Sequence, residues 1–114
     1  MQENAQLVRQ GDVLLVPVGH PSFRAPVGVM APVVSQVPGR HVLAYGEVTG
    51  HHHSLAATAG TLSLDEGGVT YLTLEELTEV THQEHAPLTL TPQMYEVRIQ
   101  REWADENEPR AVLD

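Results

Sequence analysis

Five of the seven histidines in this chain fall in two short clusters, about thirty residues apart. The first is the triplet His51-His52-His53, and the second is the segment Thr81-His82-Gln83-Glu84-His85. Imidazole is the commonest metal ligand in proteins and the side chain that most readily exchanges a proton near neutral pH. Two such clusters, brought together by a fold, would make a metal site or an acid–base pair.

The triplet is expected to be extended, because strand-like segments lie on both sides of it. Successive side chains of a strand point to opposite faces, so His51 and His53 share a face and His52 points away from them. Two imidazoles on one face can both reach a single ion at ~2.0–2.1 Å. We therefore expect His51 and His53 to belong to a site, and His52 to lie outside it.

The second cluster can contribute in two ways. An extended chain pairs His82 with Glu84, and His85 then joins them only if the chain bends before Pro87; a helical turn pairs His82 with His85 directly. Nitrogen and oxygen ligands of this kind suit a divalent metal, with zinc as the first candidate and nickel, manganese or iron as alternatives. The expected metal ligands are His51, His53, His82 and His85.

Two glutamates accompany the histidines. Glu47 precedes the triplet and Glu84 lies inside the second cluster, where a carboxylate could orient an imidazole or act as a general base. Both are candidate catalytic residues. For Glu47 the alternative is an exposed charge at the end of a strand.

The first cluster partly resembles the metal-binding motif of the cupin family. Cupins are small β-barrels in which a glycine, a His-x-His pair and a glutamate are followed by a further histidine on a later strand. Here Gly46, His51 and His53, with His82 or His85, can be placed on that scheme, but the glutamate is missing. The resemblance covers roughly residues 46–90 and implies a β-barrel with a histidine-lined interior.

Alternating apolar and polar residues, separated by turn residues, predict an all-β fold. The expected architecture is one domain over residues 1–114, a small barrel or jelly-roll-like sandwich, with residues 1–10 and 104–114 flexible or loosely docked. A long Pro-rich loop over residues 19–39 is expected near the N-terminus, either a stiff surface loop or a lid over a binding site. The expected strands are Val13–Val18, Val42–Val48, Leu62–Leu64, Val69–Leu74 and Met94–Arg101.

One segment, Thr73 to His85, is ambiguous. Thr73 and Glu76 match a helix-capping pattern, whereas Thr78, Val80 and Thr81 favour a strand. We favour the strand. The large apolar members of the alternating sets are expected to form the core: Leu15, Leu62, Leu64, Leu72, Leu88, Leu90, Tyr95, Val97 and Ile99.

The amino-acid composition argues against several classes of function. The formal net charge is −9 with no lysine, which makes nucleic-acid binding unlikely because such proteins usually present a basic surface. The chain has no cysteine, no apolar run long enough to span a membrane, and no signal-peptide pattern near Met1, so a cytoplasmic protein is expected.

Two functions remain open. The first is an acidic metal-binding β-barrel protein, with a small molecule as its ligand or substrate. The second is a non-catalytic module with a protein partner and structural or pH-sensing histidines. A strand edge near Pro17 or along Tyr95–Trp103 could also support a homo-oligomer.

Overall fold

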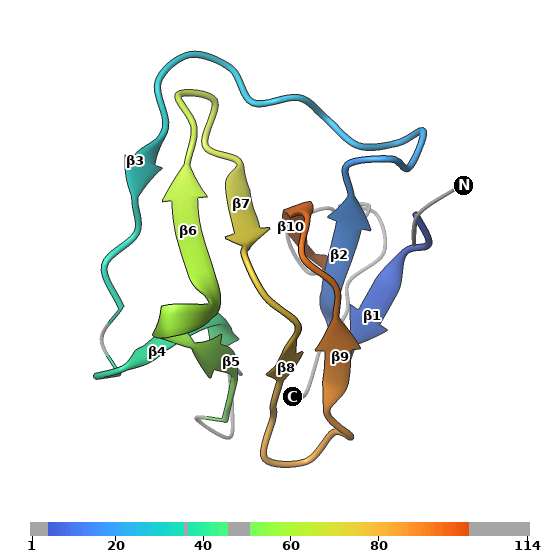
Figure 1. Ribbon diagram of the computed structural model, residues 1–114, viewed down its shortest axis with the longest axis vertical. Helices are drawn as coiled ribbons and strands as arrows, with labels where there is room; N and C mark the ends of the chain where they lie inside the picture. The colour runs from blue at the N-terminus through green and yellow to red at the C-terminus, as the bar shows by residue number, and fades with distance from the viewer. Residues whose placement is uncertain (1–4, 36, 46–50, 101–114) are drawn as a thin grey trace, which may run out of the picture.

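Strands dominate the computed structural model, which describes residues 5–35, 37–45 and 51–100. A single turn of 3-10 helix, η1 (Ala57–Ala59), interrupts them in the described part of the chain. The strands follow one another as in Figure 1: β1 (Val8–Gln10), β2 (Val13–Pro17), β3 (Ala31–Pro32), β4 (Arg40–Tyr45), β5 (His52–Ala56), β6 (Gly60–Leu64), β7 (Thr70–Leu74), β8 (Thr78–Val80), β9 (Leu88–Leu90) and β10 (Met94–Ile99).

The larger layer is a six-stranded antiparallel sheet in the order β1-β2-β10-β7-β6-β3. All five residues of β2 are buried, as expected for a strand covered on both faces. β2 and β10 are inner strands, and the edge strands of this sheet are β1 and β3. Among the described strands β1 pairs only with Val13, Leu14 and Leu15, so Pro17 is paired on one side only, with Tyr95 of β10. The suggestion that an edge near Pro17 or along Tyr95–Trp103 supports a homo-oligomer stays a prediction.

The smaller layer consists of two hairpin ladders, β4-β5 and β8-β9, joined side by side. Backbone hydrogen bonds between Ser54 and Thr81 make the joint, with N···O distances of 3.0 and 2.8 Å. Arg40 reinforces it, because its guanidinium donates to the hydroxyls of both residues. This joint brings the two histidine clusters together.

The hydrophobic core lies between the layers. Leu15, Leu62, Leu72 and Tyr95 contribute from the six-stranded sheet, and the predictions for Leu90, Val97 and Ile99 are also confirmed. Leu64 was wrongly placed in the core: it lies at the end of β6 beside the edge strand β3, and 42% of it is exposed. Leu88, at the start of the short strand β9, is only half-buried.

Gly60 shows why β6 and β7 can pack so closely. A Cβ atom at this position would lie 2.1 Å from the backbone oxygen of Thr73, so any other residue would push the two strands apart. The bend after η1 therefore depends on glycine.

The expected all-β fold is confirmed, and the expected strands are present within a few residues of their expected bounds. Residues 78–80 form strand β8, which settles the ambiguous segment in favour of a strand. Among the described strands the six-stranded sheet does not close into a barrel. Val8–Gln10 form β1 although the sequence suggested a loose segment, because their backbone pairs with β2. No helix in the described residues is long and apolar enough to cross a membrane.

The Pro-rich segment crosses the outer face of the large sheet instead of projecting from it. We call residues 18–30 the strap; it connects β2 to β3 over the top of the molecule in Figure 1. Phe23 packs edge-on against the buried ring of Tyr71, with 5.8 Å between ring centroids. The Tyr71 hydroxyl donates to the backbone oxygen of Arg24.

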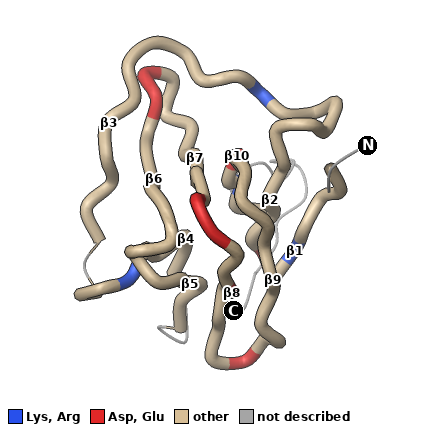
Figure 2. The backbone as a smooth tube through the Cα atoms, viewed as in Figure 1, with Lys and Arg blue, Asp and Glu red and all other residues tan. Residues whose placement is uncertain are grey.

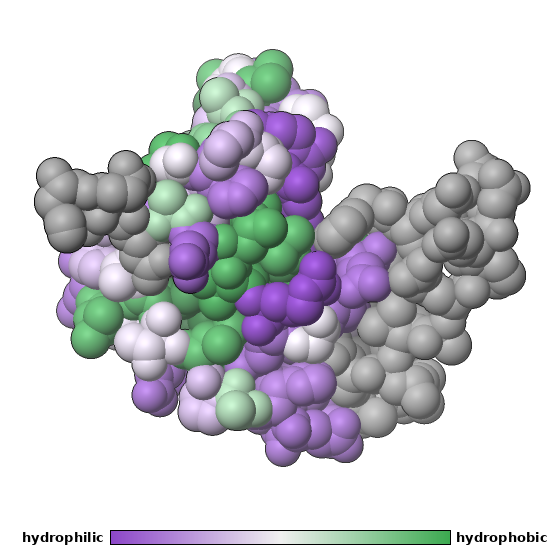
Figure 3. Space-filling view, turned by 90° about the vertical axis from the view of Figure 1, so that its right-hand side faces the viewer, coloured by the Kyte–Doolittle hydropathy of each residue, from purple (hydrophilic) through white to green (hydrophobic). Residues whose placement is uncertain are grey.

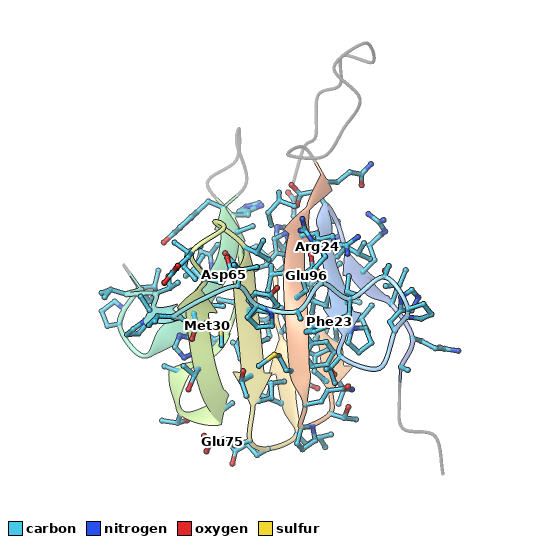
Figure 4. All side chains as sticks on the ribbon, turned by 90° about the horizontal axis from the view of Figure 1, so that it is seen from above. Phe23, Arg24, Met30, Asp65, Glu75 and Glu96 are labelled. Carbon is cyan, nitrogen blue, oxygen red and sulfur yellow. The ribbon has the colours of Figure 1, made fainter. Side chains whose placement is uncertain are left out.

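A buried carboxylate holds the strap in place. Glu96 is fully buried and accepts hydrogen bonds from the backbone and side chain of Arg24 and from the side chain of Arg98. Figure 4 shows Arg24 and Glu96 next to each other, with Phe23 on the same side of the sheet. Burial alone would raise the pKa of Glu96, but the hydrogen bonds from Arg98 and Arg24 hold it below its ordinary value of 4.5.

Candidate functional site

The candidate site forms where β5 meets the segment after β8. Ser54 and Thr81 face each other in an antiparallel bridge. The residue before one partner therefore lies opposite the residue after the other, which places His53 opposite His82. The two clusters, far apart in sequence, meet through the pairing of backbone groups that flank them.

Ring contacts connect four imidazoles. The centroids of His53 and His82 are 4.3 Å apart, and those of His82 and His85 are 4.5 Å apart. His53 and His85 are 5.9 Å apart, and His51 lies 5.6 Å from His82. The structure thus brings together the four histidines that the sequence singled out, with His82 in contact with each of the other three.

His53 lies deepest, with no exposed surface, and Gln10 orients its ring. The Gln10 amide nitrogen donates to the backbone oxygens of Val80 and Ala86, at 3.1 and 2.9 Å. Its oxygen is therefore the acceptor for Nδ1 of His53, at 2.8 Å. Nδ1 must carry a proton to donate this bond, so in the neutral ring the lone pair is on Nε2.

Nε2 of His53 faces a second buried group, the carboxylate of Asp12. The distance from Nε2 to Oδ1 is 3.4 Å, and both side chains are fully buried. A buried carboxylate is costly unless it is paired or bound to a cation. This corner of the site can be stabilised by a proton on His53 or by a metal ion.

His82 and His51 are held by the backbone and side chain of Glu84. The Glu84 backbone N–H donates to Nδ1 of His82 at 2.9 Å, which is possible because the chain bends at residues 83–85. The Glu84 carboxylate, at the solvent edge, lies 3.5 Å from Nδ1 of His51. The bend also lets His85 reach the cluster.

His52 lies away from the four clustered rings. Its ring packs edge-on against Tyr45, with centroids 5.9 Å apart, and its backbone N–H donates to the side chain of Gln83. The other two histidines are also elsewhere: His41 contacts the backbone oxygen of Gly60, and His20 contacts Ser22. Glu47 lies outside the described residues.

Gln10 and Asp12 are the site residues that the sequence analysis missed. They lie at the end of β1 and in the turn before β2, some forty residues before the first histidine cluster. Gly11 and Asp12 form the turn between β1 and β2, and Gly11 has the positive φ (58°) of a turn glycine. A polar residue next to a strand buried on both faces was the available signal, but nothing in the spacing connected it to the histidines.

The geometry does not contain a ready-made ligand set. Within residues 5–35, 37–45 and 51–100, no group of three or more His, Asp or Glu side chains is arranged to hold a metal ion. A neutral His82 that accepts a hydrogen bond at Nδ1 carries its proton on Nε2. To become a ligand as a neutral ring, through either nitrogen, His82 would have to give up the hydrogen bond from the Glu84 N–H.

Comparison with known proteins identifies a family but not an activity. No curated protein and no solved structure matches the chain. Residues 9–100, which include every described residue of the histidine site, match one family model. The chain therefore belongs to the DUF8820 family, which is described as a domain of unknown function.

Proposed function

We propose that the histidine cluster binds one divalent metal ion, with zinc as the first candidate. The observation that carries this proposal is the contact of three imidazoles, His53, His82 and His85, beside the buried Asp12 carboxylate. Rings that bind one tetrahedral ion through nitrogens at ~2.0–2.1 Å have centroids about 5 Å apart. The ring separations of 4.3–5.9 Å lie around that value.

The surroundings of His53 support this proposal. Metal-binding histidines usually donate their other ring N–H to an oxygen, which fixes the tautomer and raises the basicity of the ligating nitrogen. Gln10 supplies that oxygen here, and its own amide group is held by Val80 and Ala86. His53 Nε2 and an Asp12 oxygen would be the fixed ligands, because both groups are buried.

His82 and His85 would complete the site by rotating toward the ion. Both lie in the bent segment between β8 and β9, where side-chain rotation does not disturb a strand ladder. His51 lies at the rim of the cluster. Glu84 beside it is exposed enough to exchange a proton with a small molecule, which is the catalytic role proposed for it.

The metal content of protein purified without a tag tests the proposal, followed by zinc titration in a calorimeter. We expect one zinc per chain and a loss of binding in His53→Ala. The matched control is His52→Ala, which removes the neighbouring imidazole that packs on Tyr45 and should leave zinc binding unchanged. Equal effects of the two substitutions, or no binding to the wild-type protein, would contradict the proposal.

A second candidate function is a protein-interaction module in which the histidines are structural or pH-sensing. The fully buried His53–Asp12 pair favours it, because a proton on His53 would stabilise the carboxylate without any metal. Exposed apolar side chains on both sides of the edge strand β3 also favour it, since Val29 is 76% and Val34 is 88% exposed. Figure 3 shows another view of the surface, where hydrophobic residues gather in the middle of the face within a hydrophilic border.

The two candidates differ in what stabilises the fold. A metal site predicts that zinc raises the unfolding temperature and that a chelator lowers it again. A pH-sensing module predicts no response to zinc, together with a change in stability over the pH range in which histidines ordinarily titrate. Thermal unfolding with zinc, with chelator and across that pH range separates them.

A further inference from the structure

A second polar pocket lies at one end of the large sheet, on residues that the histidine site does not use. It has a volume of about 370 Å³. The pairing of β7 with β10 ends at Thr70 and Val97, while β10 continues to Ile99. The pocket opens beside this overhang, between Arg24 of the strap and the β6–β7 turn.

The lining combines two cations with an aliphatic wall. Arg24 and Arg98 supply the charge, Leu43, Val97 and Ile99 supply apolar surface, and no carboxylate is among the described lining residues. This composition contrasts with the acidic character of the whole chain, which carries a formal net charge of −9. Figure 2 shows acidic stretches at the β6–β7, β7–β8 and β8–β9 connections.

Glu96 and Asp65 lie close in sequence to lining residues of the pocket, and both accept hydrogen bonds from other groups. Glu96, which is fully buried, accepts from the Nε atoms of Arg24 and Arg98 at 2.6 and 2.8 Å. Asp65 accepts from the backbone N–H groups of Val27, Gly67 and Val69. These bonds, that from Val69 foremost, hold the pKa of Asp65 below its ordinary value of 3.8, so it stays ionised and bound to its own turn.

Each of the two arginines has hydrogen-bond donors left over after its bonds to Glu96. Arg98 uses Nε and Nη2 on Glu96 and on the backbone oxygen of Ser22, and Arg24 uses Nε and Nη2 on Glu96. Their Nη1 groups contact no acceptor in the part of the chain that the structure describes. Glu96 thus fixes two guanidinium groups whose remaining N–H bonds can bind another anion.

We propose that this pocket binds a small carboxylate that carries a short aliphatic chain. Guanidinium groups match the geometry of a carboxylate, and a pair held in place loses little conformational entropy on binding. The pocket volume exceeds what an inorganic anion fills and lies at the lower end of the range for small-molecule sites. Leu43, Val97 and Ile99 would contact the aliphatic chain, and Arg24 and Arg98 the carboxylate.

The test is a titration of the ¹⁵N-labelled full chain with hexanoate, followed by NMR. We expect saturable shifts concentrated on the amides of Gly68, Val69, Thr70, Arg98 and Ile99. The neutral analogue 1-hexanol should produce no saturable shifts there, because the arginines then have no charge to pair with. Absence of saturation with hexanoate, or the same response to hexanol, would overturn the proposal.

Substitutions in the pocket test which side chains bind hexanoate. Arg24→Gln should weaken hexanoate binding about tenfold, the loss of one hydrogen bond between charged groups. The matched control Arg9→Gln removes an arginine on β1 that donates to Gln100, and it should leave binding unchanged. Thr70→Phe, which keeps both arginines, should also weaken binding by filling the pocket. Wild-type affinity for hexanoate in Arg24→Gln would contradict the proposal. If a variant fails to fold, the comparison of hexanoate with hexanol on the wild-type protein still tests whether the pocket binds a carboxylate.

Discussion

Glu96 and Asp12 are both fully buried carboxylates, but one faces arginines and the other faces a histidine. Glu96 lies under the strap, where two guanidinium groups satisfy its oxygens. Arginine stays protonated at every pH that the fold survives, so this group of charges has one state. Asp12 faces His53, whose ring can gain a proton, lose it or bind a metal.

The comparison separates a structural polar cluster from one that is capable of chemistry. The Glu96 cluster attaches the strap to the sheet, and any anion would bind on its outer side. The Asp12 cluster adjoins three further imidazoles, and the partner of its carboxylate is a titratable group. A buried carboxylate therefore indicates a site of proton or metal chemistry here only when its partner can change state.

The largest effect is expected from Glu96→Ala. This change leaves two arginines without their buried partner and should cost about 3–5 kcal/mol of the free energy of unfolding, the range for breaking a buried ion pair. Chemical denaturation would measure it. The matched control is Glu79→Ala on β8, where the side chain is exposed and little change is expected. A cost for Glu96→Ala as small as that of the control would show that the strap does not depend on this cluster.

Leu72→Ala should have a similar or slightly smaller effect. Leu72 is fully buried at the centre of the core, and removal of such a side chain costs about 2–4 kcal/mol. Leu64→Ala is the internal comparison, because Leu64 follows the same alternation but is 42% exposed. Chemical denaturation measures both variants. Equal losses of the free energy of unfolding would show that the assignment of Leu72 to the core and Leu64 to the surface is wrong.

Gln10→Leu tests whether the histidine site depends on a positioned ring. The substitution keeps the volume but leaves the backbone oxygens of Val80 and Ala86 and the buried Nδ1 of His53 without this partner, which should cost about 1–3 kcal/mol. If His53 is a ligand, zinc affinity should also fall about 10–100-fold, as for other residues that orient metal-binding histidines. A stability loss with unchanged zinc affinity would make Gln10 purely structural.

The smallest effect is expected on acidification. The pKa of Glu96 is lower in the folded chain than its ordinary value of 4.5, so its contribution to stability is complete above that pH and is lost as the pH falls through the folded pKa. Stability differences between the wild type and Glu96→Gln should therefore shrink below about pH 4.5. If denaturation experiments show a stability difference that stays constant down to pH 3, the ionised Glu96 carboxylate is not the source of the extra stability of the wild type.

Much of the fold could be predicted from the sequence because strand alternation is a local signal. The faces of β10 are an example: Tyr95, Val97 and Ile99 point into the core, as their spacing indicated. The residues that alternate with them, on the opposite face, include Glu96 and Arg98, and Glu96 is fully buried. Local alternation could not reveal that the strap, 72 residues earlier in the chain, covers that face.

The candidate site was only partly predictable for the same reason. Local spacing pointed to His51 and His53 together and to His52 apart from them. The partners of His53 come from a turn 41 to 43 residues earlier, because Gln10 and Asp12 are brought to it by the packing of the two layers. Such partners carry no signal in spacing or composition and appear only in the folded chain.

The most direct test of the metal proposal is a histidine ¹H–¹⁵N long-range NMR spectrum of the full chain during a zinc titration. The account predicts that the ring nitrogens of His53, His82 and His85 shift together and stop shifting at one equivalent of zinc. His20, His41 and His52, which lie outside the cluster, should not move. A gradual shift of all the histidines, or a spectrum that zinc leaves unchanged, would contradict the metal site and leave the structural and pH-sensing role of the histidines in its place.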